Sequence, residues 1–225
     1  MIAIDDITSY EKMAEAVRKC GFLPLFANGI RGFSVEEHTP PEYWFSDNID
    51  GPWEWKGTVI RKTNCVYGKF FGGKTSFISR EWFSDFANYR RDGYDYDALC
   101  DEGLARYGDK SVYDTLVKFG SLLSKDLRFL SGYTREKKQR FEAILARLQE
   151  KCYVVIDDFI YATDCNGNRY GWGIARYTTP ETLYGQDFTD KVYQCSPEQS
   201  KIKISEHLST ILPDIPTEKL LKFIR

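Results

Sequence analysis

Between residues 110 and 177 the spacing of apolar residues changes from a helical period to a strand-like one. Two short amphipathic segments are followed by a third in which four apolar residues fall at i, i+3, i+4 and i+7, namely Phe141, Ile144, Leu145 and Leu148. Residues 153–162 and 170–177 are then rich in β-formers and flank a turn sequence at 166–168. This pattern predicts three helices followed by a β-hairpin.

Each of the three predicted helices has a polar residue suited to cap its N-terminus: Ser111, Ser124 and Thr134. Three short helices joined by tight turns and followed by a hairpin are typical of a winged helix-turn-helix. We therefore expect an α+β fold. A winged helix-turn-helix module at 110–185, with the hairpin as its wing, would pack with an N-terminal α+β region at 1–109 and a C-terminal helical tail at 186–225.

The N-terminal region contains two further β-like patterns. Gly72-Gly73 separates two β-rich segments, which predicts a hairpin over Val66–Ile78. In Gly51-Pro-Trp-Glu-Trp-Lys-Gly57 the alternation predicts a strand with Trp53 and Trp55 on one side. Two rings on one face suit either a hydrophobic core or a pocket that sandwiches an extruded base. Four candidate residues would line such a pocket: Trp53, Trp55, Tyr89 and Arg90.

The charge distribution indicates what the helical segment could bind. The net charge is only −2, but residues 110–151 carry 10 basic and 5 acidic side chains. A basic block in an acidic chain is expected of a phosphate-binding surface, although a solvated lysine-rich helix has the same composition. The candidate nucleic-acid contacts are Arg135, Lys138, Gln139, Arg140 and Arg147 on the third helix and Arg169 at the hairpin tip. Glu136, Glu142 and Glu150 share that helix and oppose phosphate binding.

Candidate catalytic groups are limited to carboxylates. His38 and His207 are the only histidines, and no serine or cysteine nucleophile motif accompanies either. Glu37, Glu54 and Asp85 are the candidates for activating a water molecule, with Glu36 beside the first of them. The carboxylates between Asp85 and Asp97 match no calcium-loop spacing.

Several classes of site are not supported by the sequence. No phosphate-binding glycine motif occurs, and the six cysteines form no C-x-x-C pair, so we expect neither a cofactor nor a metal. No apolar run approaches the ~20 residues that cross a bilayer, and the N-terminal residues lack the pattern of a signal peptide. These observations predict no membrane partner and a cytoplasmic location. Oligomeric state is left open.

Several strings of residues resemble the bacterial AlkZ-related family. They are Gly51–Gly57, Tyr67-Gly-Lys-Phe-Phe71, Phe77-Ile-Ser-Arg-Glu-Trp-Phe83, Asp85-Phe-Ala-Asn-Tyr-Arg-Arg-Asp-Gly-Tyr94 and Tyr170-Gly-Trp-Gly173. The resemblance implies a distant kinship to AlkZ-type DNA glycosylases, which are built from tandem winged-helix units and excise alkylated or cross-linked bases. Those enzymes orient the attacking water with a Gln-x-Gln or Gln-x-Asp motif. None of the five glutamines here has Gln or Asp two residues later, so the resemblance implies no catalytic residue.

Three functions fit these observations. The first is binding of duplex DNA, including damaged (alkylated) DNA, by the winged helix without a cofactor. The second is a monofunctional glycosylase in which one of the candidate carboxylates replaces the missing glutamine motif. The third is a protein-binding adaptor, which follows if the basic residues are neutralised within the chain. A cleft holding a carboxylate beside Trp53 or Trp55 would favour the glycosylase.

Overall fold

The sheet is the element that connects the two halves of the chain. The computed structural model describes residues 4–46, 48–167 and 169–225. Over these residues the strands form one six-stranded sheet in the order β1-β3-β2-β5-β6-β4, and every pair is antiparallel. The strands are β1 (Phe22–Pro24), β2 (Val66–Phe71), β3 (Lys74–Ile78), β4 (Leu122–Leu123), β5 (Val155–Thr163) and β6 (Arg169–Thr178). The expected α+β class is confirmed.

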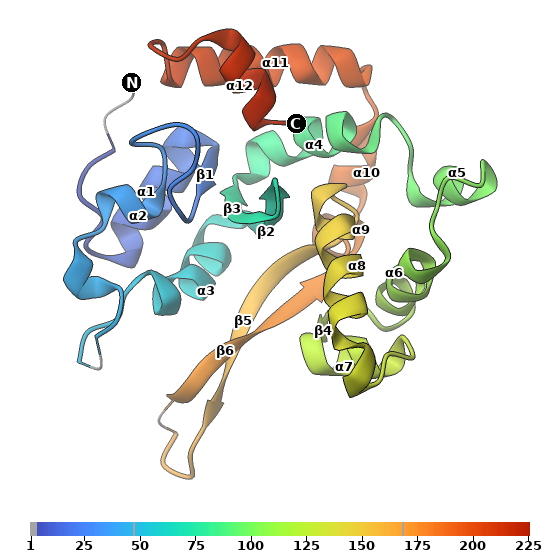
Figure 1. Ribbon diagram of the computed structural model, residues 1–225, viewed down its shortest axis with the longest axis horizontal. Coiled ribbons are helices and arrows are strands. Elements are labelled where there is room, and N and C mark those ends of the chain that lie inside the picture. The colour runs from blue at the N-terminus through green and yellow to red at the C-terminus, as the bar shows by residue number, and fades with distance from the viewer. Residues whose placement is uncertain (1–3, 47, 168) are drawn as a thin grey trace.

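Both predicted hairpins are present. Gly72 and Gly73 have φ of 56° and 76°, a conformation that glycine adopts without strain and that matches the twist of a two-residue hairpin turn. Strands β5 and β6 form the longer hairpin, which extends away from the body of the molecule (Figure 1). At its turn Asn166 N–H donates to Asp164 Oδ1 (2.9 Å) and Gly167 has φ of 83°. Asn168, which we expected in this turn, lies outside the described residues.

Helices cover the sheet and its edges (Figure 1). The N-terminal half contributes α1 (Tyr10–Cys20), α2 (Val35–His38), η1 (Pro41–Tyr43), α3 (Pro52–Thr63), α4 (Arg80–Arg91) and α5 (Tyr96–Asp101). The middle contributes α6 (Tyr107–Phe119), α7 (Ser124–Leu130), η2 (Arg135–Lys137) and α8 (Lys138–Glu150). The last part contributes α9 (Pro180–Tyr184), α10 (Gln186–Val192), α11 (Pro197–Ile211) and α12 (Thr217–Phe223). Over the described residues no helix is long and apolar enough to cross a membrane.

The prediction of a strand at Gly51–Gly57 is wrong, because these residues begin helix α3. Pro52 occupies the first helical position, and Glu54 Oε2 accepts a hydrogen bond from the Gly51 N–H (3.0 Å), which stabilises the helix start. Residues two apart on a helix point in divergent directions. Trp55 is therefore buried against Tyr43, whereas Trp53 packs elsewhere.

The prediction of three helices before the long hairpin is confirmed, with different starting points. Phe141, Ile144, Leu145 and Leu148 of α8 are all buried, as the helical period requires. Helix α6 begins at Tyr107, four residues before the predicted cap. Ser111 therefore lies inside the helix, and its hydroxyl donates to the Ser131 carbonyl (2.8 Å). Ser124 is the first residue of α7 and caps nothing, and a single 3₁₀ turn, η2, follows Thr134.

A buried arginine ties four segments of the chain together. The Arg91 side chain is 0% exposed at the end of α4 and donates to Glu181 Oε1 on α9 (2.7 Å). It also donates to the Cys152 carbonyl before β5 (2.8 Å) and to the Tyr193 hydroxyl after α10 (3.0 Å). The guanidinium lies 4.6 Å from the centre of the Tyr153 ring. Burial by itself would lower the pKa of Arg91, but Glu181 and Tyr193 outweigh it and the pKa is raised.

Replacing Arg91 with alanine should lower the free energy of unfolding by about 3–5 kcal/mol, because Glu181 would lose its counter-charge and the Cys152 carbonyl its donor. Urea unfolding checks this. The matched control is Arg80→Ala on the same helix, whose exposed pair with Asp187 should contribute at most about 1 kcal/mol. Equal losses in the two variants would contradict the role given to Arg91.

Candidate nucleic-acid interface

The entry to α8 presents a run of solvent-exposed cations. Burial of the apolar stripe of α8 leaves the opposite side facing solvent, with Arg135, Lys137, Lys138, Gln139 and Arg140 exposed. Within the described part of the chain, no ion pair joins the four cations among them to a carboxylate. The positive charge on this surface is therefore available to an external anion.

Arg147, on the same helix, differs from the other candidate contacts. Its guanidinium forms a two-pronged ion pair with Asp109 near the start of α6, including an Nε–Oδ2 bond of 2.9 Å. The hydrogen bonds to Asp109 raise the pKa of Arg147. The side chain thus connects α8 to α6, and a phosphate would have to compete with Asp109 for it.

The tip of the long hairpin combines a cation with exposed rings. Arg169 is exposed at the start of β6, and its guanidinium lies 5.5 Å from the centre of the Tyr161 ring. Tyr170 and Trp172 follow on the same strand and are 60% and 70% exposed. Trp172 also meets Trp53 edge-on, with ring centres 6.1 Å apart. Sequence reasoning assigned neither Tyr170 nor Trp172 to a site, although their alternation with glycine was a signal.

A cavity of about 350 Å³ lies between α3 and this hairpin. It brings together two residues that the sequence placed in different roles, the carboxylate of Glu54 and the guanidinium of Arg169. The other residues that line it are Gly57, Arg61, Phe159, Ile160, Tyr161 and Thr163. Burial raises the pKa of the Tyr161 phenol, whose hydroxyl donates to the Trp53 carbonyl (3.0 Å). The cavity therefore holds one carboxylate among cations and rings.

Trp53 and Lys56 form an unusual pair beside this cavity. Lys56 is 7% exposed, and its ammonium lies 4.6 Å from the centre of the Trp53 ring and 4.1 Å from that of Phe159. Over the described residues no carboxylate forms an ion pair with it. Burial lowers the pKa of Lys56 to about 8, and the negative charge of Glu54 offsets only part of this effect.

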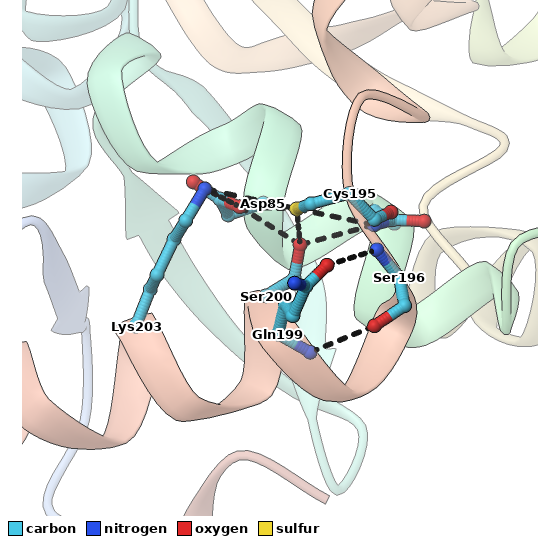
Figure 2. Close-up of polar contacts among 7 residues, drawn as sticks. Asp85, Cys195, Ser196, Gln199, Ser200 and Lys203 are labelled. Carbon is cyan, nitrogen blue, oxygen red and sulfur yellow. Dashed lines mark hydrogen bonds and ion pairs between the residues drawn. The ribbon is translucent and has the colours of Figure 1, made fainter.

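Asp85 lies in a different part of the fold, where α11 packs on α4. Its Oδ1 atom accepts from the Ser200 hydroxyl (2.8 Å) and from Lys203 Nζ (3.2 Å), as Figure 2 shows. The hydrogen bond with Asp85 raises the pKa of Lys203. Asn88 donates to the same serine hydroxyl (3.0 Å). Cys195 completes the cluster, with Sγ 3.2 Å from the Ser200 hydroxyl. These contacts use the carboxylate of Asp85 to hold α11 on α4.

The remaining candidates have structural partners. Glu37 accepts from the Gly32 N–H (2.7 Å) and the Ser34 hydroxyl (2.6 Å), which fixes the loop before α2. Arg90 donates to the Glu150 carbonyl at the end of α8 (2.7 Å) and to the carbonyls of the last two residues. Tyr89 is half-buried against the core. It and Arg90 lie on α4, whereas the two tryptophans lie on α3.

No group of three or more His, Cys, Asp or Glu side chains in the described ranges is arranged to hold a metal ion. All six cysteines are free. Gln149, one of the five glutamines, is buried, accepts from the Lys69 N–H (3.1 Å) and donates to the Leu145 carbonyl (3.0 Å). Its amide is thus occupied by the backbone of α8 and β2.

Comparison with known proteins decides the family. The sequence model described as AlkZ related matches residues 7–225. The chain belongs to the AlkZ-related family. No curated protein and no solved structure matches it. The strings of residues that resemble the family lie in α3, β2, β3, α4 and β6 of this AlkZ-related protein. They include Glu54, which lines the cavity between α3 and the long hairpin (the hairpin-side cavity), and the exposed rings of β6.

Lys56 should give the stability of the AlkZ-related protein a specific pH dependence. Folded Lys56 loses its proton near pH 8, whereas in the unfolded chain it keeps the proton up to its ordinary pKa of 10.5. Between these values the unfolded state binds more protons, so the contribution of Lys56 to the free energy of unfolding rises with pH. Lys56→Met removes this term. Below pH 8 the variant should have a higher free energy of unfolding than the parent, because it buries no charge. This difference should shrink as pH rises from 8 to 10.

The measurement is urea unfolding of both proteins at several pH values. The control is Lys62→Met, on the exposed side of the same helix, for which the difference from the parent should be nearly independent of pH. A constant difference for Lys56→Met over the same range would show that Lys56 stays charged in the folded protein.

Proposed function

We propose that the AlkZ-related protein binds DNA through a winged helix-turn-helix formed by α6, α7 and α8 with β4, β5 and β6. The order of these elements supports this proposal. Strand β4 lies between the first two helices and pairs with β6, through Leu122 opposite Tyr177 and Leu123 opposite Arg176. This pairing ties the connection between α6 and α7 to the base of the hairpin, as expected of a winged helix. We propose that this unit, which begins at Tyr107, is the winged helix-turn-helix expected at residues 110–185.

The exposed cations at the entry to α8 are the observation that carries the proposal. Arg135, Lys138 and Arg140 lack internal partners among the described residues, so binding phosphate breaks no ion pair. Helix α8 would enter the major groove by its N-terminal half, with Gln139 among its exposed side chains, and Arg169 would contact the backbone from the wing. Figure 1 places α7 and the hairpin tip at the same end of the molecule, away from α11 and α12.

The exposed rings of the wing favour damaged DNA as the target. A lesion weakens stacking in the duplex, and an unstacked base can be held against flat side chains such as Tyr170 and Trp172. The AlkZ relationship of the family points to alkylated DNA in particular. The cavity that contains Glu54 lies under the same hairpin, which favours a glycosylase as the second candidate function.

Replacing Arg135, Lys138 and Arg140 together with alanine should weaken duplex binding similarly for all sequences. It should also reduce the salt slope by about 0.9 for each phosphate that the variant no longer neutralises. Fluorescence anisotropy with labelled duplex at several salt concentrations measures both quantities. The control removes three cations elsewhere, Lys12, Lys191 and Lys201. If the parent protein binds no DNA at low salt, the winged helix serves as a protein-binding adaptor instead.

Base excision should be absent or slow, because no Gln-x-Gln or Gln-x-Asp motif is present to orient water. The test is incubation with duplex containing 7-methylguanine, followed by assays for free base and abasic sites. Turnover that is lost in Glu54→Gln and kept in Asp85→Asn would make the protein a glycosylase centred on the hairpin-side cavity. Loss in Asp85→Asn alone would move the chemistry to the α4–α11 contact.

A further inference from the structure

A second cavity lies at the other end of the sheet, where α12 covers the ends of β1, β2 and β3. Its volume is about 510 Å³, within the range of small-molecule sites. Figure 1 shows α12 at the opposite end of the molecule from the tip of the long hairpin. The residues that line it are Pro24, Asn28, Gly29, Ile30, Phe71, Gly72, Lys74, Ser76, Lys219, Lys222 and Phe223.

One part of this cavity is apolar and firmly held. The rings of Phe71 and Phe223 are stacked, with centres 4.3 Å apart and planes inclined by 23°. Phe71 and Ile30 are buried among core residues, so neither can turn out to solvent. This surface suits the flat apolar part of a ligand.

The rim of the cavity is positively charged. Lys219 and Lys222, three residues apart on α12, are exposed and form no ion pair with any carboxylate among the described residues. Lys74 donates to the Ala27 carbonyl (3.0 Å), which keeps its ammonium near the cavity without neutralising it. None of the described residues that line the cavity is acidic. The rim therefore favours an anionic group.

A third observation points to a ligand independently of charge. The Ser76 side chain is fully buried in the wall of the cavity, and its hydroxyl has no hydrogen-bond partner among the described residues. A buried hydroxyl without a partner destabilises the protein unless a bound group supplies one. If the serine side chain rotates toward the cavity, an oxygen or nitrogen atom of a ligand would do so.

We infer that this cavity binds a small organic anion with a flat apolar ring, held by Phe71 and Phe223 on one side and by Lys219 and Lys222 on the other. The anionic group is a phosphate or a carboxylate, and a polar atom of the ligand pairs with the Ser76 hydroxyl. This site is separate from the nucleic-acid interface, and its existence does not depend on the proposed function.

The test uses two fluorescent probes that share an apolar skeleton and differ in charge. The anionic probe 8-anilinonaphthalene-1-sulfonate should bind at one saturable site, and neutral N-phenyl-1-naphthylamine at least tenfold more weakly. The double variant Lys219→Ala/Lys222→Ala should weaken binding of the anionic probe at least tenfold, and the control Lys137→Ala/Lys138→Ala should not. Equal binding of the two probes, or no effect of the α12 lysines, would overturn the proposal.

Two further variants separate loss of the site from loss of the fold. Gly29 lines the cavity, its φ is not positive, and a Cβ built there meets no atom within 4 Å, so Gly29→Leu should block both probes without changing Tm. Ser76→Ala should weaken binding of the anionic probe several-fold while leaving Tm unchanged or higher. Displacement of that probe by deoxyadenosine monophosphate would assign a phosphate ligand, and displacement by salicylate a carboxylate. Displacement by neither, or undiminished binding in Gly29→Leu, would contradict the inference.

Discussion

The buried guanidinium of Arg91 fixes the relation between the two halves of this protein. Helix α4 leaves the N-terminal strands at Arg80 and ends at Arg91, where three hydrogen bonds reach the start of β5 and the segments that follow β6. A buried cation is costly without compensation, so Glu181, Tyr193 and the Cys152 carbonyl must be in place together. Because Cys152 lies just before β5 and Glu181 just after β6, these contacts help to fix the base of the long hairpin.

The six-stranded sheet also holds the two halves of the protein together. Strands β2 and β5 meet at the pair formed by Tyr67 and Ile156, and through it the N-terminal hairpin continues into the long one. Nearby, Asp157 pairs with Arg176 across the long hairpin, and Asp158 pairs with Arg61 of α3. Ion pairs and buried core residues thus hold the base of the hairpin, whereas its tip is exposed. The candidate interface has a rigid base and an accessible tip.

Local signals in the sequence predicted those parts of the fold that depend on neighbouring residues. The spacing of Phe141, Ile144, Leu145 and Leu148 located α8, and Gly72-Gly73 located a hairpin, because period and turn chemistry act over a few positions. Trp53 and Trp55 gave a misleading pattern, since alternation over seven residues is also compatible with a helix that begins at a proline. The decisive feature there was Glu54, whose carboxylate caps the helix start.

Contacts between distant residues could not be predicted in this way. Nothing near Arg147 in the sequence indicates that Asp109 holds it, and Asp85 gives no sign of its partners on α11. The cavity beside α12 is assembled from segments nearly 200 residues apart, so its lysines and its buried serine looked unrelated along the chain. The exposed entry of α8 was predictable because an amphipathic period fixes both of its faces.

The hairpin has one more consequence, which follows from how its burial changes along its length. Residues 155–159 of β5 are buried, whereas the described residues beyond them become exposed toward the turn, and β6 shows the reverse order. Amide protons should therefore exchange with solvent in a gradient, slowest beside Cys152 and fastest near Gly167. The outer part of the hairpin can fray and re-form while the core stays folded. Such a surface can adjust its curvature to a partner, and the edge-on contact of Trp172 with Trp53 ties β6 to α3.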